Sequence, residues 1–147
     1  MKTDITVVAY IIYENKVLLT HHKKLDLWLP PGGHVEPNED FEIALLREIK
    51  EELDIEIEIL NYSDIPIVAD TLKNLPVPFY SNVHNVGDHN HCGLYYLCKA
   101  KNKKINLNTD ELLDYEWFSK EDLNQEHVPA DVRAIATKAL AIYKSIT

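Results

Sequence analysis

The stretch GHVEPNEDFEIALLREIKEELDI, residues 33–55, contains the pattern that decides the fold. Its apolar residues recur at intervals of four, at Phe41, Leu45, Ile49 and Leu53. This spacing predicts an amphipathic helix with one face toward a core. Asn38 is the expected N-cap, because an asparagine side chain accepts hydrogen bonds from first-turn amides. Asp54 ends the pattern, so we expect the helix to end beside it.

Three carboxylates lie on the same predicted helix. Glu48, Glu51 and Glu52 stand at positions i, i+3 and i+4, so they project from one face within a single turn. Like charges at this spacing repel one another and destabilise a helix. Hard divalent cations, which prefer oxygen ligands, would neutralise them. Gly32 and Gly33 lie just upstream, and a glycine can bring a backbone carbonyl close to the same ion without steric cost.

A salt-bridged helix surface is the alternative explanation of these charges. Arg47 can pair with Glu51, and Lys50 can pair with Glu51 or Asp54. Such exposed pairs would soften the repulsion without a metal ion. Charged helix surfaces are common, so the segment REIKEE, residues 47–52, fits this explanation better when it is taken alone. The residues that surround the segment change the balance.

The whole stretch resembles the signature of the Nudix hydrolase family. That signature reads Gly, five residues, Glu, seven residues, then Arg-Glu-apolar-any-Glu-Glu-any-Gly-apolar. The matching residues are Gly33, Glu39, Arg47, Glu48, Ile49, Glu51, Glu52 and Ile55. Asp54 replaces the closing glycine, which serves as a helix C-cap, and aspartate tolerates the left-handed conformation only modestly. The flanking segments Trp28-Leu29-Pro30 and Glu116-Trp117-Phe118 also resemble the family.

The resemblance implies a hydrolase that cleaves a phosphoanhydride bond with the help of Mg²⁺ or Mn²⁺. The three helix glutamates match the family's metal-binding and base positions, and Gly33 matches its carbonyl ligand. Arg47 and Glu39 match an ion pair that orients the helix. Divalent metals suit this chemistry because they neutralise phosphate charge and lower the pKa of bound water. We therefore expect Arg47 and the three glutamates to be the catalytic group.

Family members often add a glutamate from outside the motif to the metal site. Glu111 is the expected one, because it lies just before the Glu116-Trp117 pair, and Asp110 and Asp114 are the next choices. Solvated surface charges are the alternative for this segment. The resemblance favours Glu111 as both a metal ligand and a catalytic residue.

The rest of the chain alternates between strand and helix patterns. Runs of β-branched and aromatic residues predict strands at 6–13, 17–20, 65–69, 93–100 and 115–118. Alternating isoleucines predict another strand that begins at Ile55. Residues 75–90 are expected to form a loop and residues 130–145 a second helix. These elements favour one α/β domain over residues 1–147 with a mixed sheet, and the resemblance implies a Nudix-like α/β/α sandwich.

Three histidines, His84, His89 and His91, have two interpretations. With the neighbouring cysteine they could form a transition-metal site, although no convincing ligand set is visible. The favoured interpretation places them along a substrate cleft. His91 and Tyr95 share one face of a strand by parity, and His34 lies beside the metal loop. We therefore predict that His34, His91 and Tyr95 bind the substrate.

Composition excludes several classes of partner. The chain of 147 residues has a formal net charge of -9, so nucleic acid is a poor partner for it. The sequence has no run of 18 apolar residues and no signal-peptide core, so we expect no membrane association. Cys92 and Cys98, on one strand, would lie about 20 Å apart, which is too far for a disulfide. Two free thiols fit a reducing compartment, so we expect a cytoplasmic protein.

A small-molecule nucleotide is the expected substrate. The first choice is a nucleoside diphosphate linked to another moiety, such as ADP-ribose, and the second is an ordinary or oxidised nucleoside triphosphate. A non-catalytic, nucleotide-binding regulatory domain is the alternative of another class. Such domains usually lose glutamates of the motif, and here all are present. Many relatives form dimers, so a homodimer is compatible with the resemblance.

Overall fold

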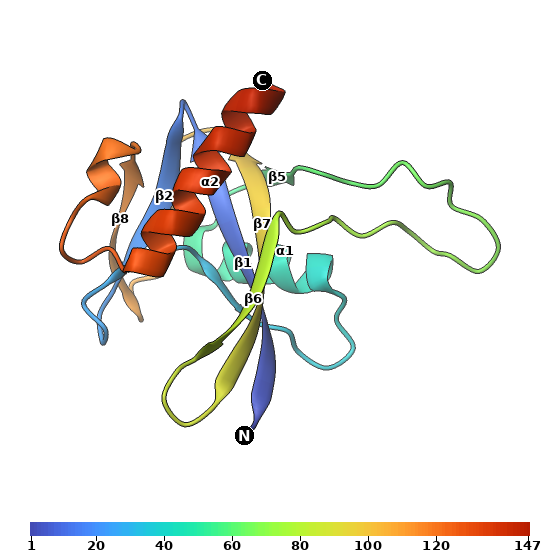
Figure 1. The fold of residues 1–147 in the computed structure, drawn as a ribbon, viewed down its shortest axis with the longest axis horizontal. Coiled ribbons are helices and arrows are strands. Elements are labelled where there is room, and N and C mark those ends of the chain that lie inside the picture. Colours follow the sequence, from blue (N-terminus) through green and yellow to red (C-terminus); the bar gives the residue numbers. More distant parts are fainter.

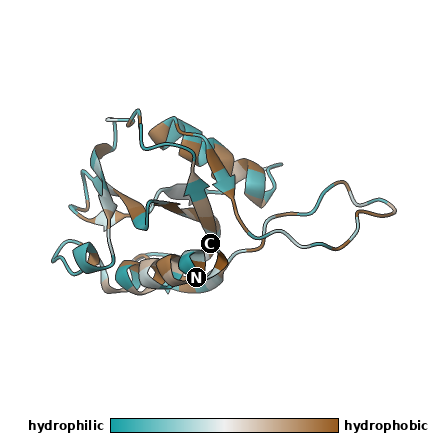
Figure 2. Cartoon of the chain, turned by 90° about the horizontal axis from the view of Figure 1, so that it is seen from above, coloured by the Kyte–Doolittle hydropathy of each residue, from teal (hydrophilic) through white to brown (hydrophobic).

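A mixed β-sheet lies between two helices in the computed structural model, which describes residues 1–147 (Figure 1). Helix α1 (Phe41–Leu53) covers one face of the sheet and α2 (Ala130–Ile146) covers the other (Figure 2). This arrangement confirms the predicted α/β/α sandwich. Neither helix combines the length and the apolar character that a membrane crossing requires.

Two long parallel strands form the centre of the sheet. Strands β1 (Thr3–Tyr13) and β7 (Asn90–Ala100) pair in parallel, with Asp4 opposite His91. Strand β1 pairs on its other side with β4 near its beginning and with β2 near its end. The remaining elements are β2 (Lys16–His22), β3 (Trp28–Leu29), β4 (Gly32–His34), β5 (Ile57–Ile59), β6 (Tyr80–Asn85), β8 (Leu112–Phe118) and a 3₁₀ turn, η1 (Glu121–Leu123).

The core has one half on each side of the sheet, and β1 contributes to both. Its alternate residues point to opposite faces, as strand geometry requires. Val7, Ala9 and Ile11 pack on the side of α1, whereas Tyr10 and Ile12 pack on the side of α2. The predicted apolar stripe of α1 is confirmed, since Leu45, Ile49 and Leu53 are fully buried there.

The ends of α1 differ in part from the prediction. Asp40, and not Asn38, is the N-cap, and its carboxylate accepts a hydrogen bond from the Ile43 amide at 2.8 Å. Asn38 lies instead in the preceding turn with a φ of 69°. Asp54 ends the helix as expected, in the left-handed conformation, and its amide donates to the Lys50 carbonyl. A non-glycine residue therefore takes the place of the closing glycine.

Two segments contradict the predicted strand pattern. Residues 65–69 form no strand but belong to an extended excursion, residues 60–79, that projects from the body of the domain (Figure 1). Pro66 lacks an amide donor, and Ile65 and Ile67 remain exposed without a partner strand. Residues 75–90, predicted as a loop, contain β6, which pairs with β7 through a turn where Gly87 has a φ of 113°.

Candidate active site

A cavity of about 620 Å³ is lined by side chains from β1, β4, β7 and both helices. It gathers all but one of the predicted site residues: Gly33, His34, Glu48, Glu51, Glu52, His91, Tyr95 and Glu111. Pairing of β4 and β7 with opposite edges of β1 brings these distant parts of the chain together. The exception, Arg47, does not line the cavity but contacts its glutamates.

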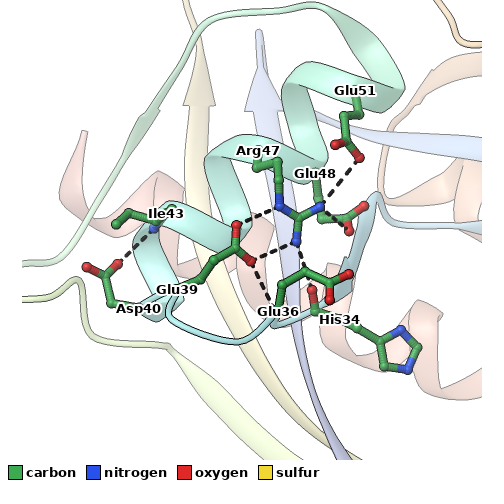
Figure 3. A network of polar contacts seen from close by, with 8 residues as sticks. All are labelled: His34, Glu36, Glu39, Asp40, Ile43, Arg47, Glu48 and Glu51. Carbon is green, nitrogen blue, oxygen red and sulfur yellow. Dashed lines mark hydrogen bonds and ion pairs between the residues drawn. The ribbon is translucent and has the colours of Figure 1, made fainter.

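Arg47 joins the helix to the loop that precedes it (Figure 3). Its Nε and Nη2 atoms donate to both carboxylate oxygens of Glu39, at 2.7 and 2.9 Å. Its Nη1 atom donates to Glu48 at 2.9 Å, and Nη2 also reaches the His34 carbonyl at 3.0 Å. The ion pairs with Glu39 and Glu48 raise the pKa of Arg47. The guanidinium thus fixes one glutamate of the cavity relative to β4.

Glu52 lies at the most crowded point of the carboxylate group. Burial raises its pKa to about 8, and the negative charges of Glu48, Glu111 and Glu51 add to the shift, while the Gly32 amide opposes it. Burial likewise raises the pKa of Glu48, although Arg47 partly offsets that effect. The cavity therefore holds more negative charge than its one guanidinium neighbour compensates.

The donors of this group fit a hard divalent cation. They are carboxylate oxygens, and the backbone of Gly33 packs so closely against Glu48 that an added Cβ would come within 2.5 Å of the Glu48 carboxylate oxygens. Mg²⁺ and Mn²⁺ prefer such oxygen donors. A bound cation would also relieve the repulsion that raises the pKa of Glu52. The ion pairs of the salt-bridge alternative do form, between Arg47 and Glu51 at 3.4 Å and between Lys50 and Asp54. Glu48 and Glu52 nevertheless line the cavity, so those pairs do not account for the whole carboxylate face.

Glu111 lines the same cavity, although it lies far from α1 in the sequence. It lies in the turn before β8, where its carbonyl accepts a hydrogen bond from the Lys23 amide at 3.0 Å. Its charge contributes to the raised pKa of Glu52. Asp110 and Asp114, the two other choices, do not line the cavity. The structure thus brings Glu111, alone among the three, to the glutamates of α1.

Comparison with known proteins agrees with this geometry. A family model described as NUDIX domain matches residues 2–138. The chain belongs to the NUDIX family. A NUDIX-family hydrolase from Clostridium perfringens has a structure with a TM-score of 0.87 and 32% sequence identity, which covers 97% of this chain and 99% of that one. The prediction of a Nudix-type pyrophosphohydrolase is therefore confirmed at the level of the family, whose members generally use a divalent metal.

The names of two relatives of this NUDIX domain state the substrates on which those relatives act. Nucleoside triphosphatase NudI from Klebsiella pneumoniae (strain 342) is 31% identical over 72% of this chain and 71% of that protein. An 8-oxo-dGTP diphosphatase from Buchnera aphidicola is 41% identical over 61 residues, which is 39% of this chain. The matched region spans 47%, or about half, of that diphosphatase.

The sequence did not reveal the wall that α2 of the NUDIX domain gives to the cavity. Asp131, Val132 and Ile135 line it, together with residues of β1 such as Val8 and Tyr10. An apolar side chain at helical spacing looks the same whether it faces a core or a cavity, so periodicity alone does not separate the two. Asp131 is the only charged member of this wall on α2. Burial raises the pKa values of Tyr10 and Tyr95, and the charge of Asp131 adds to both shifts.

Tyr95 is a buried residue of the cavity wall whose hydroxyl is already hydrogen-bonded. Its hydroxyl donates to Asn82 Oδ1 at 2.9 Å, and its ring packs at a tilt against Tyr80 and Tyr10. Burial raises the pKa of Tyr95. Tyr80 itself does not line the cavity.

The histidines lie at the other end of the NUDIX cavity. His34, His84 and His91 line it, whereas His89 does not. The rings of His34 and His91 are perpendicular, with centroids 5.1 Å apart. Asp4, which the sequence reasoning missed, lies beside them because β1 pairs with β7 in register.

Proposed function

We propose that this NUDIX domain is a nucleoside triphosphate pyrophosphohydrolase that uses Mg²⁺ or Mn²⁺. The observation that carries the proposal is the crowding of Glu48, Glu52 and Glu111 in one cavity, with a pKa of Glu52 raised to about 8. Glu51 and the Gly33 carbonyl complete the proposed ligand set. Four carboxylates with hard oxygen donors suit these cations.

The chain's own residues have distinct tasks in this proposal. The divalent cation neutralises phosphate charge and makes water more acidic. Glu48, Glu51, Glu52 and Glu111 are the residues that would hold the cation, and whichever of these carboxylates is not a ligand would accept the proton of the attacking water. Arg47 positions Glu48 through their 2.9 Å hydrogen bond. In-line attack depends on such fixed placement of the reacting groups.

The nucleoside is proposed to occupy the opposite half of the cavity. Tyr95 supplies an aromatic surface there, and Val132 and Ile135 supply an apolar one. His34 and His91, which the sequence also predicted to bind the substrate, line the cavity at its other end, and no contact with the nucleoside is proposed for them.

Nucleoside triphosphates replace ADP-ribose-like compounds as the first choice. The motif alone favoured a nucleoside diphosphate linked to another moiety. NudI, at 31% identity over 72% of this chain, is named a nucleoside triphosphatase, and the 8-oxo-dGTP diphosphatase also acts on a triphosphate by its name. A cytoplasmic location belongs to the proposal as well, because both Cys92 and Cys98 are free thiols.

A substrate panel tests this proposal. Ordinary nucleoside triphosphates, 8-oxo-dGTP and ADP-ribose are each incubated with the protein and Mg²⁺ or Mn²⁺, and the products are separated by chromatography. Cleavage of a triphosphate is measured as nucleoside monophosphate and pyrophosphate, and cleavage of ADP-ribose as AMP and ribose 5-phosphate. The proposal requires faster turnover of at least one triphosphate than of ADP-ribose. The reverse order would restore the diphosphate choice, and nucleotide binding without any turnover would identify a regulatory domain.

A further inference from the structure

A second group of metal-binding side chains lies at the histidine end of the cavity. Asp4 of β1, His34 of β4, His89 and His91 each offer one ligand atom, and these four atoms lie within 4.8 Å of one another. The carboxylates of α1 do not belong to this group. Its chemistry is also different, because three of its four donors are imidazoles.

The closest distances in this group match the edges of a coordination tetrahedron. The Nε2 atoms of His89 and His91 are 3.1 Å apart, and Asp4 Oδ2 lies 3.6 Å from the Nε2 atoms of both His34 and His89. A tetrahedral Zn²⁺ site with bonds of about 2.0–2.1 Å has ligand atoms about 3.3–3.4 Å apart. Small side-chain adjustments would close the remaining pairs around one ion.

Hydrogen bonding does not account for this packing. One shared proton can satisfy the His89–His91 contact, but the two 3.6 Å separations from Asp4 exceed hydrogen-bond length. Asp4 is thus within ion-pair distance of two imidazoles but hydrogen-bonds to neither, and the four side chains converge on a common point. Convergence of this kind is expected around an ion.

The orientation of His89 supports metal binding. Its Nδ1 atom lies 2.7 Å from a carboxylate oxygen of Asp88. A carboxylate accepts hydrogen bonds, so this contact holds the proton on Nδ1 and leaves Nε2 with a lone pair directed at Asp4 and His91. Histidine ligands of metals commonly have such a carboxylate partner behind them.

The sheet holds these ligands in place. Asp4 pairs with His91 across β1 and β7, and Thr6 pairs with His34 across β1 and β4. Because residues 4 and 6 of β1 share a face, the side chains from the three adjacent strands come to the same side. His89 joins them from the turn between β6 and β7. Ligands on paired strands are placed more exactly than ligands on free loops.

We infer that Asp4, His34, His89 and His91 bind a transition-metal ion of the Zn²⁺ class at a site separate from the glutamates. Imidazole donors select such ions, whereas the carboxylates of α1 suit Mg²⁺ or Mn²⁺. Four protein ligands make this a closed, structural site. The ion would fasten the β6–β7 turn and the beginning of β1 to His34, whose carbonyl holds Arg47. This inference does not depend on the proposed hydrolysis.

Zn²⁺ titration of the chelator-treated full chain tests the inference. Calorimetry in excess Mg²⁺, which saturates hard oxygen sites, is expected to find about one Zn²⁺ bound per chain. His89→Ala and His91→Ala should each weaken binding about a hundredfold or more, and Asp88→Asn about tenfold through its loss as the partner of His89. Circular dichroism establishes that each variant is folded.

Two control variants make the result decisive. His127→Ala removes a half-exposed histidine that bonds only to Asp26, and Glu52→Gln alters the carboxylate site. Both are expected to bind Zn²⁺ as the unaltered chain does in excess Mg²⁺. Loss of Zn²⁺ binding in Glu52→Gln with full binding in the His89 and His91 variants would overturn the inference. So would the absence of Zn²⁺ binding when Mg²⁺ is in excess.

Discussion

The Glu48 carboxylate occupies the space that a side chain at residue 33 would need. A Cβ added to Gly33 would lie 2.3 Å from Glu48 Cδ, whereas one added to Gly32 would lie 2.3 Å from the backbone oxygen of Val7. The two adjacent glycines therefore meet different neighbours. One faces the flexible end of a side chain in the active site, and the other faces the rigid backbone of β1.

Gly33→Ala and Gly32→Ala should consequently fail in different ways. Gly33→Ala displaces Glu48, so turnover should fall about a hundredfold, the scale expected from misplacing a catalytic group by about 1 Å. Its stability should change by less than about 1 kcal/mol, because the Glu48 side chain can move aside. Gly32→Ala should lose roughly 2–3 kcal/mol of unfolding free energy through overpacking against the strand. Steady-state kinetics measures the turnover of both variants, and urea denaturation measures their free energies of unfolding. Equal free energies of unfolding would contradict the prediction.

Metal dependence is the second prediction. Hydrolysis should stop in the presence of a chelator and return with added Mg²⁺ or Mn²⁺, because the carboxylate cavity would otherwise repel a phosphate.

Glu52→Gln should lower turnover by at least about a hundredfold while the domain remains folded. Chelator-treated protein with full activity would rule out the metal site, and near-normal turnover of Glu52→Gln would show that the site is misplaced.

The sequence supports the prediction of α1 and its glutamates because both depend on local spacing. The four-residue interval from Phe41 to Leu53 places an apolar stripe on one side of the helix, and its stripe is buried as expected. Glu111 is predicted only from the family resemblance and its place just before the Glu116-Trp117 pair, because a charge in a loop has no periodicity to identify it. Its approach to Glu52 depends on the pairing of β8 with β2, which is not a local property.

Elements that depend on distant partners could not be predicted in this way. Strand β6 lacks apolar alternation and is stabilised by its pairing with β7, so its sequence resembled a loop. Ile65 and Ile67 alternate as in a strand, but no neighbouring strand lies beside them. The group of Asp4, His34, His89 and His91 requires the register of three strands, and no single segment of sequence contains that information.

The metal-free protein should lose stability as pH rises, because of Glu52. Its pKa is raised to about 8 in the folded state from an ordinary value of 4.5. Between these values the folded chain keeps a proton that the unfolded chain has released, so the free energy of unfolding falls with rising pH and levels off above about pH 8. The two pKa values differ by about 3.5 units, and at about 1.4 kcal/mol per unit the loss is on the order of 5 kcal/mol.

Comparison with Glu52→Gln isolates this effect from the other titrating groups. The variant lacks the buried carboxylate, so in chelator it should be more stable than the unaltered protein at pH 8 and nearly equal to it at pH 5. Saturating Mg²⁺ should reduce the difference at pH 8, since a cation stabilises the ionised carboxylate. Urea denaturation at the two pH values gives the measurement, and parallel curves for the two proteins would contradict the assignment.

Glu111 is tested by a matched pair of substitutions. Glu111 lines the cavity and its charge raises the pKa of Glu52, whereas Glu121 lies in the 3₁₀ turn after β8 and does not line the cavity. If Glu111 is a metal ligand, Glu111→Gln should lower turnover at least about tenfold and shift the Mg²⁺ activation curve to higher concentration. Glu121→Gln should leave both unchanged, because an exposed charge outside the cavity contributes little. Turnover measured across a metal titration decides between the roles; superimposable curves for the two variants would remove Glu111 from the ligand set and leave the three glutamates of α1 to hold the cation.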